Sequence, residues 1–195
     1  MVQGSRESII NAVFRIASKN PDKSKLTMTE IAKEAGMSRQ AIYQKHFSSV
    51  DEIFDYIHTS MTEEVFKTFK RSIADPSIHS IYEAVARDVI PKVYQKRIQA
   101  RILYHTSIDR NVFNFLEESY LQLLLEADNI HIINNSPLMT PSMIKIVINY
   151  IFALVGEWVA EDFPEPPEVF AKTFLTLMET APKGLVDAKP KINKS

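Results

Sequence analysis

The chain has no cysteine among its 195 residues and only four glycines. Without cysteine there can be no disulfide bonds, thiolate metal sites or zinc fingers. Scarce glycine leaves no phosphate-cradling glycine loop and no nucleophile elbow. The five histidines are scattered and lack the spacing of paired metal ligands. We therefore expect a protein that is not an enzyme and that holds no metal or cofactor.

The sequence also lacks a long uninterrupted apolar run. Its first residues, MVQGSRESIINAVF, mix polar and acidic side chains with apolar ones, unlike a signal peptide. The most apolar stretch, 146–159, is interrupted by Asn149 and Glu157, and it is shorter than the roughly 20 residues of a membrane span. We expect a cytoplasmic protein in which this stretch forms a helix that is buried on all sides.

Charge of one sign does not dominate the chain, whose formal net charge is −1. The distribution is uneven, however. Residues 1–50 hold eight Lys or Arg and four Asp or Glu, which leaves 15 basic and 20 acidic residues for the rest. A basic N-terminal part on an acidic body is typical of a small DNA-reading module joined to a domain with another task.

Residues 27–47, TMTEIAKEAGMSRQAIYQKHF, predict a helix, a turn and a second helix. Thr27 and Glu30 have the spacing of a capping box, which starts a helix. Gly36 permits the left-handed backbone that ends it, and Ser38 can cap a second helix that runs to about His46. A helix-turn-helix of this kind presents its second helix to the major groove of DNA.

The outward face of the second helix carries groups that hydrogen-bond to DNA. Arginine reads guanine and glutamine reads adenine, whereas lysine and tyrosine hold phosphates. The alternative is an ordinary surface helix rich in long polar side chains. The absence of acidic residues from 39–46 favours the DNA-binding interpretation. The candidate DNA-binding residues are Thr27, Ser38, Arg39, Gln40, Tyr43, Gln44, Lys45 and His46.

Apolar periodicity and helix breakers predict helices along the rest of the chain. The first runs from after Ser5 to about Asn20, and the cap at Ser49 opens a long helix to about Ser72. Pro91 ends or kinks the next helix. Further helices are expected at 92–106, 110–126, from Thr140 onward and at 167–181, with a loop at 129–141. The expected fold class is all-α.

The N-terminal pattern resembles the TetR family of transcriptional regulators over roughly the first 55 residues. The matching positions are Arg6, Ile9, Ala12, Phe14, Ile31, Ala32, Ala35, Gly36, Met37, Ser38, Ile42, Tyr43, His46 and Phe47. The resemblance implies a three-helix DNA-binding domain at 1–50. It also implies a helical regulatory and dimerisation domain at 51–182, and a flexible lysine-rich tail remains at 183–195.

The chain departs from the family pattern at three positions. Gln40 stands where glycine is usual in the recognition helix, and Val50 stands where lysine is common at the start of the next helix. The interval from Tyr43 to Phe47 is one residue longer than usual.

Candidates for a dimer interface and a ligand site come from the C-terminal helices. Small residues on one face of 146–160 would let another helix approach, either from a second subunit or from the same chain. The interface candidates are Ala153, Gly156, Ala160, Phe170 and Phe174. Aromatic or polar residues on apolar helices are ligand-binding candidates, namely Tyr104, His105, Phe113, Tyr120, Tyr150, Glu157 and Trp158. Glu157 needs a partner such as Arg87 or Arg101, or a cationic ligand.

Together these patterns predict a repressor that binds a palindromic operator in double-stranded DNA as a homodimer and is released by a small-molecule effector. The alternative is an interaction protein or co-regulator of the same fold that acts with another protein and without a small ligand. The sequence leaves the effector, the operator, the regulated genes and the sign of regulation open.

Overall fold

The computed structural model describes residues 2–109, 111–127 and 139–180, and over these ranges the chain is helical and contains no strand. The all-α prediction is confirmed. The expected tail at 183–195 and residues 129–138 of the expected loop lie outside the described residues. The helices are α1 Val2–Lys19, α2 Met28–Ala35, α3 Arg39–Lys45, α4 Val50–Ile73, α5 Ile81–Ala84, the π-helical η1 Val85–Val89, α6 Ile90–Gln95, α7 Arg97–His105, α8 Val112–Glu126, α9 Thr140–Ala160 and α10 Pro167–Glu179.

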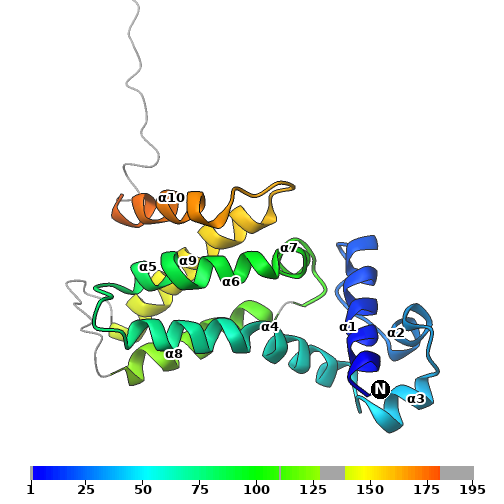
Figure 1. Cartoon of the computed structure of the whole chain (residues 1–195). Coiled ribbons are helices and arrows are strands. Elements are labelled where there is room, and N and C mark those ends of the chain that lie inside the picture. Colours follow the sequence, from blue (N-terminus) through cyan, green and yellow to red (C-terminus); the bar gives the residue numbers. More distant parts are fainter. Residues whose placement is uncertain (1, 110, 128–138, 181–195) are drawn as a thin grey trace, which may run out of the picture.

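The helices form two groups joined by α4. Helices α1, α2 and α3 stand at one end of the molecule, and α5 to α10 form the larger group at the other end (Figure 1). Within the larger group, α9 packs against α7 and α8, whereas α10 covers the row formed by α5, η1 and α6 (Figure 1). The helix α4 belongs to both groups.

Local capping sets the helix-turn-helix as predicted. The hydroxyl of Thr27 accepts a hydrogen bond from the backbone N–H of Glu30 at 3.3 Å, and the Glu30 carboxylate accepts one from the backbone N–H of Thr27 at 2.9 Å. Gly36 has φ +66°, the left-handed conformation that glycine adopts without steric cost. Ser38 accepts a hydrogen bond from the N–H of Ala41 at 3.1 Å and starts α3.

The three N-terminal helices close on a filled core. Ile9, Ile31 and Ile42 have no exposed surface, and Phe47 is 2% exposed. The core continues past the three helices, because Ile53 and Ile57 of α4 are equally buried and Leu103, Ile108 and Val112 of the α7–α8 region belong to the same cluster. The group formed by α1, α2 and α3 is therefore packed directly against part of the larger group.

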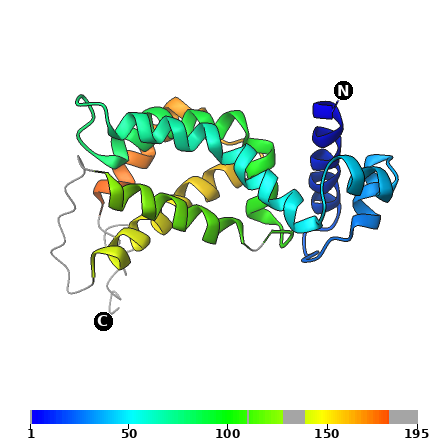
Figure 2. The same cartoon turned by 90° about the horizontal axis from the view of Figure 1, so that it is seen from below.

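The long helix α4 bends along its length (Figure 2). Three hydroxyl side chains in its middle, Thr59, Ser60 and Thr62, donate to backbone carbonyls three or four residues earlier, at 2.7 to 3.1 Å. Such back-bonding bends helices. The ammonium of Lys96 adds a further donor to the same stretch, at 2.7 Å from the carbonyl oxygen of Ser60. Carbonyl oxygens that accept hydrogen bonds from side chains as well as from the helix backbone favour a bend in this part of α4.

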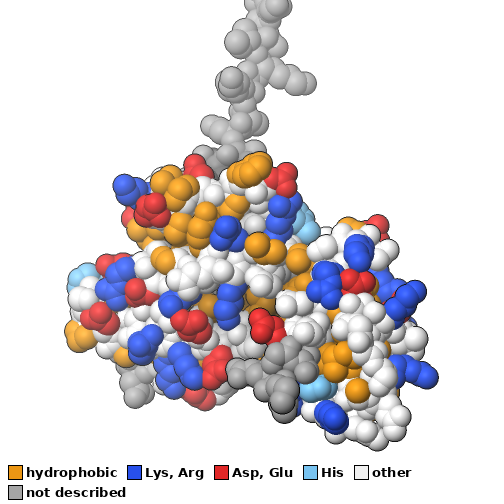
Figure 3. All heavy atoms as spheres, turned by 45° about the vertical axis from the view of Figure 1, so that its right-hand side comes forward, with side chains coloured by type: hydrophobic (Ala, Val, Ile, Leu, Met, Phe, Trp, Pro, Cys, Tyr) orange, Lys and Arg blue, Asp and Glu red, His pale blue; other side chains and the backbone are white. Residues whose placement is uncertain are grey.

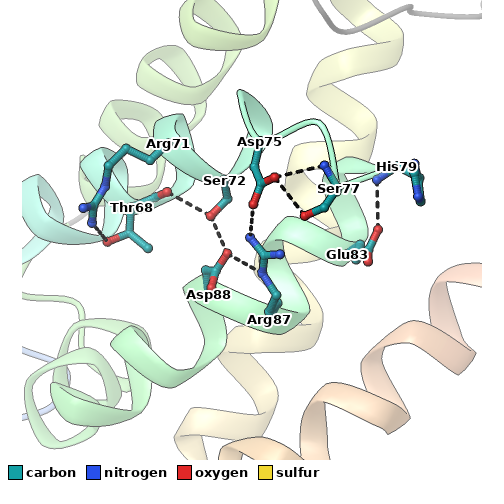
Figure 4. Close-up of polar contacts among 9 residues, drawn as sticks. All are labelled: Thr68, Arg71, Ser72, Asp75, Ser77, His79, Glu83, Arg87 and Asp88. Carbon is teal, nitrogen blue, oxygen red and sulfur yellow. Dashed lines mark hydrogen bonds and ion pairs between the residues drawn. The ribbon is translucent and has the colours of Figure 1, made fainter.

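The C-terminal end of α4 is anchored by a polar network (Figure 4). Ser72 donates to the carbonyl oxygen of Thr68 at 3.0 Å and also to the carboxylate of Asp88 on η1. Arg87 pairs with Asp88 at 2.9 Å and with Asp75, just after α4, at 3.2 Å. This end of α4 is thus fixed to the larger group of helices.

Pro91 neither ends the helix nor separates it into two. The chain passes from α5 through the π-helical turn η1 into α6, and Pro91 lies in the first turn of α6. Proline has no N–H and its ring crowds the carbonyl four residues earlier. A π turn, in which the N–H of Ile90 donates to the carbonyl of Val85, widens the helix at that point and accommodates the ring.

The helix α9 is not buried on all sides, which corrects the expectation from its composition. Ile144, Ile148 and Ile151 are buried, but Ile146 is 53% exposed and Ala153 is exposed as well. Among the described residues, α9 is the one helix long and apolar enough to match a membrane span, a criterion that the core helices of soluble proteins also meet. Its composition instead reflects one face in the core and a second apolar face on the surface.

Candidate DNA-binding surface and ligand cavity

The second helix of the helix-turn-helix presents the predicted surface. Arg39, Gln40, Tyr43, Gln44 and Lys45 are all exposed, and 51% of Tyr43 is accessible. The opposite face of α3 holds Ile42 in the core. A short helix with five exposed long polar or aromatic side chains and no acidic residue is suited to the negative major groove.

The N-cap residues of α2 and α3 were also predicted to bind DNA. Thr27 and Ser38 are both exposed, and both hydroxyls are engaged in capping their own helices. The guanidinium of Arg39 lies 3.4 Å from the hydroxyl of Thr29 on α2, and this contact links the two helices at the surface.

His46 does not belong to the exposed surface, which corrects its assignment as a DNA-binding residue. Its side chain is 9% exposed and lies with Phe47 on the core side. The cause is the longer interval after Tyr43, because the N–H groups of both His46 and Phe47 donate to the carbonyl of Ile42, at 2.9 and 3.1 Å. This wide closing turn brings both rings inward.

Arg6 of α1 holds the end of α3 in place. Its guanidinium lies 5.2 Å from the ring centre of Phe47 and 5.3 Å from that of Tyr56 on α4. The same group donates to the carbonyl of His46 at 3.3 Å. Cation–π contacts of this kind contribute roughly 0.5–1 kcal/mol each at partly exposed sites. Arg6 therefore supports the recognition helix from behind.

The N-terminus of α4 is occupied by a carboxylate of the same chain. Glu52 accepts hydrogen bonds from both the N–H and the hydroxyl of Ser48, at 2.6 Å, and these bonds lower the pKa of Glu52. Helix N-termini attract anions. Glu52 already provides one here, so a DNA phosphate finds fewer free donors at this position than a bare helix start would offer.

Positive charge spreads over the N-terminal helices (Figure 3). Glu30 and Glu34, two of the acidic residues there, are held in ion pairs, Glu30 with Lys23 at 2.7 Å and Glu34 with Arg15 at 2.8 Å. These pairs neutralise acid that would otherwise repel DNA phosphates. Arg39 and Lys45 on α3 form no ion pair within the described residues, so their charges remain available to DNA phosphates.

A cavity of about 180 Å³ lies inside the larger group of helices. Its wall is formed by residues of α4 to α9, and most of the lining side chains are aliphatic or aromatic. Ligand sites in proteins are typically apolar cavities with a few polar groups. By composition and position this cavity is a candidate ligand site.

Three of the seven predicted ligand-binding residues line this cavity, namely Tyr104, Phe113 and Tyr120. The other four do not form part of its wall. His105 contacts the carbonyl oxygen of Ala160 at 3.1 Å, and Tyr150 buries its hydroxyl without a partner among the described residues.

Trp158 and Glu157 also lie elsewhere than expected. Trp158 stacks on Phe170 with ring centres 4.3 Å apart and donates to the carbonyl of Glu165 at 3.0 Å, so it fixes the turn between α9 and α10. Glu157 is exposed and accepts a hydrogen bond from the hydroxyl of Tyr104 at 2.7 Å. Neither expected arginine is its partner, because Arg87 pairs with Asp75 and Asp88, and Arg101 pairs with Asp162.

Gly156 is needed where α7 and α9 touch. A Cβ at this position would lie 2.2 Å from Cε2 of Tyr104, far inside van der Waals contact. Burial, together with the hydrogen bond to Glu157, raises the pKa of Tyr104 to about 12, so the phenol stays neutral in this position. Both Gly156 and Tyr104 form part of the cavity wall.

Four of the five interface candidates are buried inside a single chain. They are Gly156, Ala160, Phe170 and Phe174, and the last has no exposed surface. Ala153 is the exception and is exposed. Gly156 and Ala160 therefore pack within the same chain, which was the alternative to packing against a second subunit. Only Ala153 among the small residues of this face remains exposed.

Sequence reasoning missed the contribution of α4 to the cavity wall. His58, Met61 and Thr62 line the cavity, and His58 forms a buried contact with Asp109 in the segment between α7 and α8. The only sequence signal was the position of His58 next to Ile57 on an otherwise apolar stripe. The partner is 51 residues away in sequence, so spacing alone does not reveal the pair.

The geometry defines a helix-turn-helix with an exposed second helix at one end of a helical protein. Residues 24–57 match the family described as "Bacterial regulatory proteins, tetR family". This segment comprises α2, α3 and the first turns of α4. Over this segment the match confirms the resemblance to the TetR family that was found in the sequence.

Comparison with solved structures identifies the TetR family repressor AlkX from Dietzia sp. strain DQ12-45-1b, which is implicated in the biodegradation of n-alkanes. The two chains are 18% identical, the alignment covers 89% of this chain and 92% of that one, and the TM-score is 0.45. No curated protein matches the chain.

Proposed function

We propose that the protein is a cytoplasmic transcriptional repressor that binds a near-palindromic operator as a homodimer and releases it when a small molecule enters the cavity. The observation that carries the proposal is the joint presence of two features. The exposed face of α3 holds five long polar or aromatic side chains, and an apolar cavity adjoins the helix that connects this face to the rest of the molecule.

Four of the five exposed residues of α3 have a role that follows from their chemistry and position. Arg39 and Gln40 lie in its first turn, the part that meets base edges when a recognition helix enters the groove. Tyr43 and Lys45 lie farther along and suit phosphate contacts. Base contacts specify the sequence, whereas phosphate contacts position the protein without reading it.

A homodimer would present α3 twice. The exposed face of α9, which includes Ile146 and Ala153, and the exposed side of α10, which includes Val169, are apolar enough to pack against a second copy. Apolar side chains gather over α10 on the surface (Figure 3). With twofold symmetry the two recognition helices can be set about 34 Å apart, one turn of DNA.

Two connections link the cavity to the DNA-reading end. Leu103 and Val112 line the cavity and also belong to the core beneath α1 to α3. The N–H of Ser107, between them in sequence, donates to the carbonyl of Pro21 in the loop that follows α1, at 2.7 Å. A ligand that moves this wall would thus act on the packing of the N-terminal helices.

The bend in α4 gives the movement a place to occur. Its C-terminal end is anchored by Ser72 and Asp88, and its N-terminal end is held in the DNA-binding core through Ile53. Between them, His58 reaches Asp109 beside the cavity. A ligand that binds better to a conformer with a different bend would shift the population toward it and separate the recognition helices.

The DNA-binding part of the proposal is tested by gel shifts with DNA from upstream of the protein's own gene. We expect specific retention by the purified protein alone. Tyr43→Ala and Lys45→Ala should weaken binding to all sequences, whereas Arg39→Ala and Gln40→Ala should relax base preference, at roughly 1–3 kcal/mol per lost contact. Lys67→Ala, an exposed lysine of α4 paired with Glu63, is the control and should leave binding unchanged.

Two outcomes would contradict this assignment. Unchanged sequence preference in the Arg39 and Gln40 variants would mean that other residues read the bases. Absence of retention by the protein alone would favour a co-regulator that needs another protein to bind DNA.

The dimer interface is tested with two exposed isoleucines. Ile146→Glu on α9 places charge in the proposed interface and should dissociate the dimer in sedimentation analysis, whereas Ile98→Glu on α7 should leave it intact; their exposures, 53% and 65%, are comparable. A bulky residue at Gly156 is a poor test because it would collide with Tyr104 of the same chain. A dimeric Ile146→Glu variant would exclude this face of α9.

A further inference from the structure

The cavity wall offers few polar groups, and most of them already have partners. Five polar side chains line it, those of His58, Thr62, Lys96, Tyr104 and Tyr120. The hydroxyl of Thr62 donates to the carbonyl of His58 at 2.7 Å, and that of Tyr104 donates to Glu157 at 2.7 Å. His58 is bound to Asp109, and Lys96 to backbone carbonyls of α4. The hydroxyl protons of Thr62 and Tyr104 are therefore already used, so a ligand that accepts a hydrogen bond would have to displace an existing contact at either group.

Tyr120 is the exception. It lies on α8, where its ring meets the rings of Phe66, Phe69 and Phe152 edge-on, with centre separations of 5.4 to 5.7 Å. Within the described part of the chain its hydroxyl has no hydrogen-bond partner. Burial raises the pKa of Tyr120, which keeps the group a neutral hydroxyl. A hydroxyl among aromatic rings in a cavity wall can donate one hydrogen bond to a bound molecule and accept one from it.

We infer that the effector is an uncharged, mainly apolar molecule of modest size whose one hydrogen-bonding group pairs with the hydroxyl of Tyr120. The inference rests on the proposed function, since it names the ligand class of the proposed effector site. A cavity of about 180 Å³ is comparable with an apolar cavity of about 150 Å³ that holds benzene.

The remaining wall argues against a charged ligand. No carboxylate lines the cavity in the described residues, so an ammonium group would enter without a counter-ion. Of the two nitrogen-bearing side chains in the described wall, His58 is already paired with Asp109, and the ammonium of Lys96 is held at 2.7 Å from the carbonyl of Ser60 and 3.3 Å from that of Met61. A buried charge without a partner is costly, whereas a neutral molecule requires only the removal of apolar surface from water.

Four six-carbon probes that differ in one group test the inference on purified protein without DNA, by titration calorimetry at neutral pH. They are hexanol, hexane, the hexanoate anion and the hexylammonium cation. Hexanol should bind most tightly. Tyr120→Phe should weaken hexanol binding roughly three- to tenfold, the range expected for one hydrogen bond, and should leave hexane binding unchanged.

Tyr150→Phe is the matched control, because the Tyr150 hydroxyl is also buried but lies outside the cavity wall. It should not alter hexanol binding. Lys96→Met is the second variant, and it should leave hexanol binding within about twofold because Lys96 is not the partner of a neutral ligand.

Three results would overturn the inference. They are tighter binding of hexanoate or hexylammonium than of hexanol, undiminished hexanol binding by Tyr120→Phe, and failure of all four probes to bind. The proposed DNA-binding function is judged separately by gel shift. Retention of DNA with no probe binding would thus reject the ligand class alone, and probe binding without DNA retention would reject the repressor alone.

Discussion

The two ends of the molecule differ in how completely their cores are filled. Beneath α1 to α3, residues such as Ile31 and Ile42 have no exposed surface and their neighbours close around them. In the larger group the apolar faces of the helices enclose a cavity of about 180 Å³. Protein interiors are normally packed to crystal-like density, so an unfilled interior sacrifices dispersion contacts.

This difference matches two kinds of task. Under the proposed function, the N-terminal end holds Arg39 and Tyr43 in one geometry relative to the DNA groove, which a filled core and capped helices provide. Under the same proposal, the other end accepts a small molecule and changes its conformation when it does so. An incompletely filled core around a bent helix, braced by the contacts of His58 and Lys96, supplies that adaptability.

The largest predicted effect compares the two cores with the same substitution. Ile42→Ala in the filled core should destabilise the protein by about 3 kcal/mol, within the range for buried isoleucine. Ile151→Ala in the cavity wall should cost about 1–2 kcal/mol, because part of its surface already lacks neighbours. Urea unfolding followed by circular dichroism and by fluorescence of Trp158, at fixed protein concentration, measures both. Equal losses would show that the two cores are packed alike.

A smaller effect should appear when side chains are enlarged. Val13→Leu in the filled core should cost about 1–3 kcal/mol through overpacking. Val155→Leu points new volume at the cavity and should be neutral or slightly stabilising. The same urea titrations test the pair, and a loss of hexanol affinity in Val155→Leu would confirm that the added methylene occupies the cavity. A cost for Val155→Leu that matches that of Val13→Leu would contradict the comparison.

The smallest effect concerns pH and only the DNA-reading end. Hydrogen bonds from Lys23 and Thr27 lower the pKa of Glu30 from 4.5 to about 2. Because the folded-state pKa is depressed, the resulting stabilisation is complete above pH 4.5 and is lost as the pH falls toward 2. Glu30 is partly exposed, so we expect only about 1 kcal/mol.

Thermal unfolding between pH 5 and pH 2 provides the measurement for Glu30→Gln, which should lose part of the acid sensitivity of the parent. Glu179→Gln is the control, since Glu179 is exposed and has no ion-pair partner among the described residues. Identical acid sensitivity in the parent and in Glu30→Gln would show that the capping box does not contribute in this range.

The features that the sequence predicted are those set by local spacing, and the features that it missed depend on tertiary packing. Thr27, Gly36 and Ser38 determine local backbone geometry within four residues, so the helix-turn-helix was predictable from spacing alone. The burial of His46 was not, because it depends on how the turn after Tyr43 closes against α1. Among the ligand candidates, Tyr120 and Trp158 both lie on apolar helices, so the sequence does not distinguish them. Tertiary packing places Tyr120 in the cavity wall and Trp158 against the turn before α10.

The exposed face of α9 escaped prediction for a related reason. Ile146 and Ile148 are the same residue type on one helix, but the first is 53% exposed and the second 3%. Composition cannot distinguish an apolar helix face that packs within the same chain from an apolar face that remains exposed on the surface. That distinction depends on where α7 and α8 lie.

Selection of binding sites from random DNA by the purified protein tests the central claim most directly. The account predicts enrichment of a near-palindrome whose half-sites are about one helical turn apart, bound by a dimer, with base preference relaxed at defined positions by Arg39→Ala and Gln40→Ala. Enrichment of no sequence, or of a site whose base preferences are unaffected when Arg39 and Gln40 are replaced, would contradict the assignment of the exposed face of α3 as the reading surface.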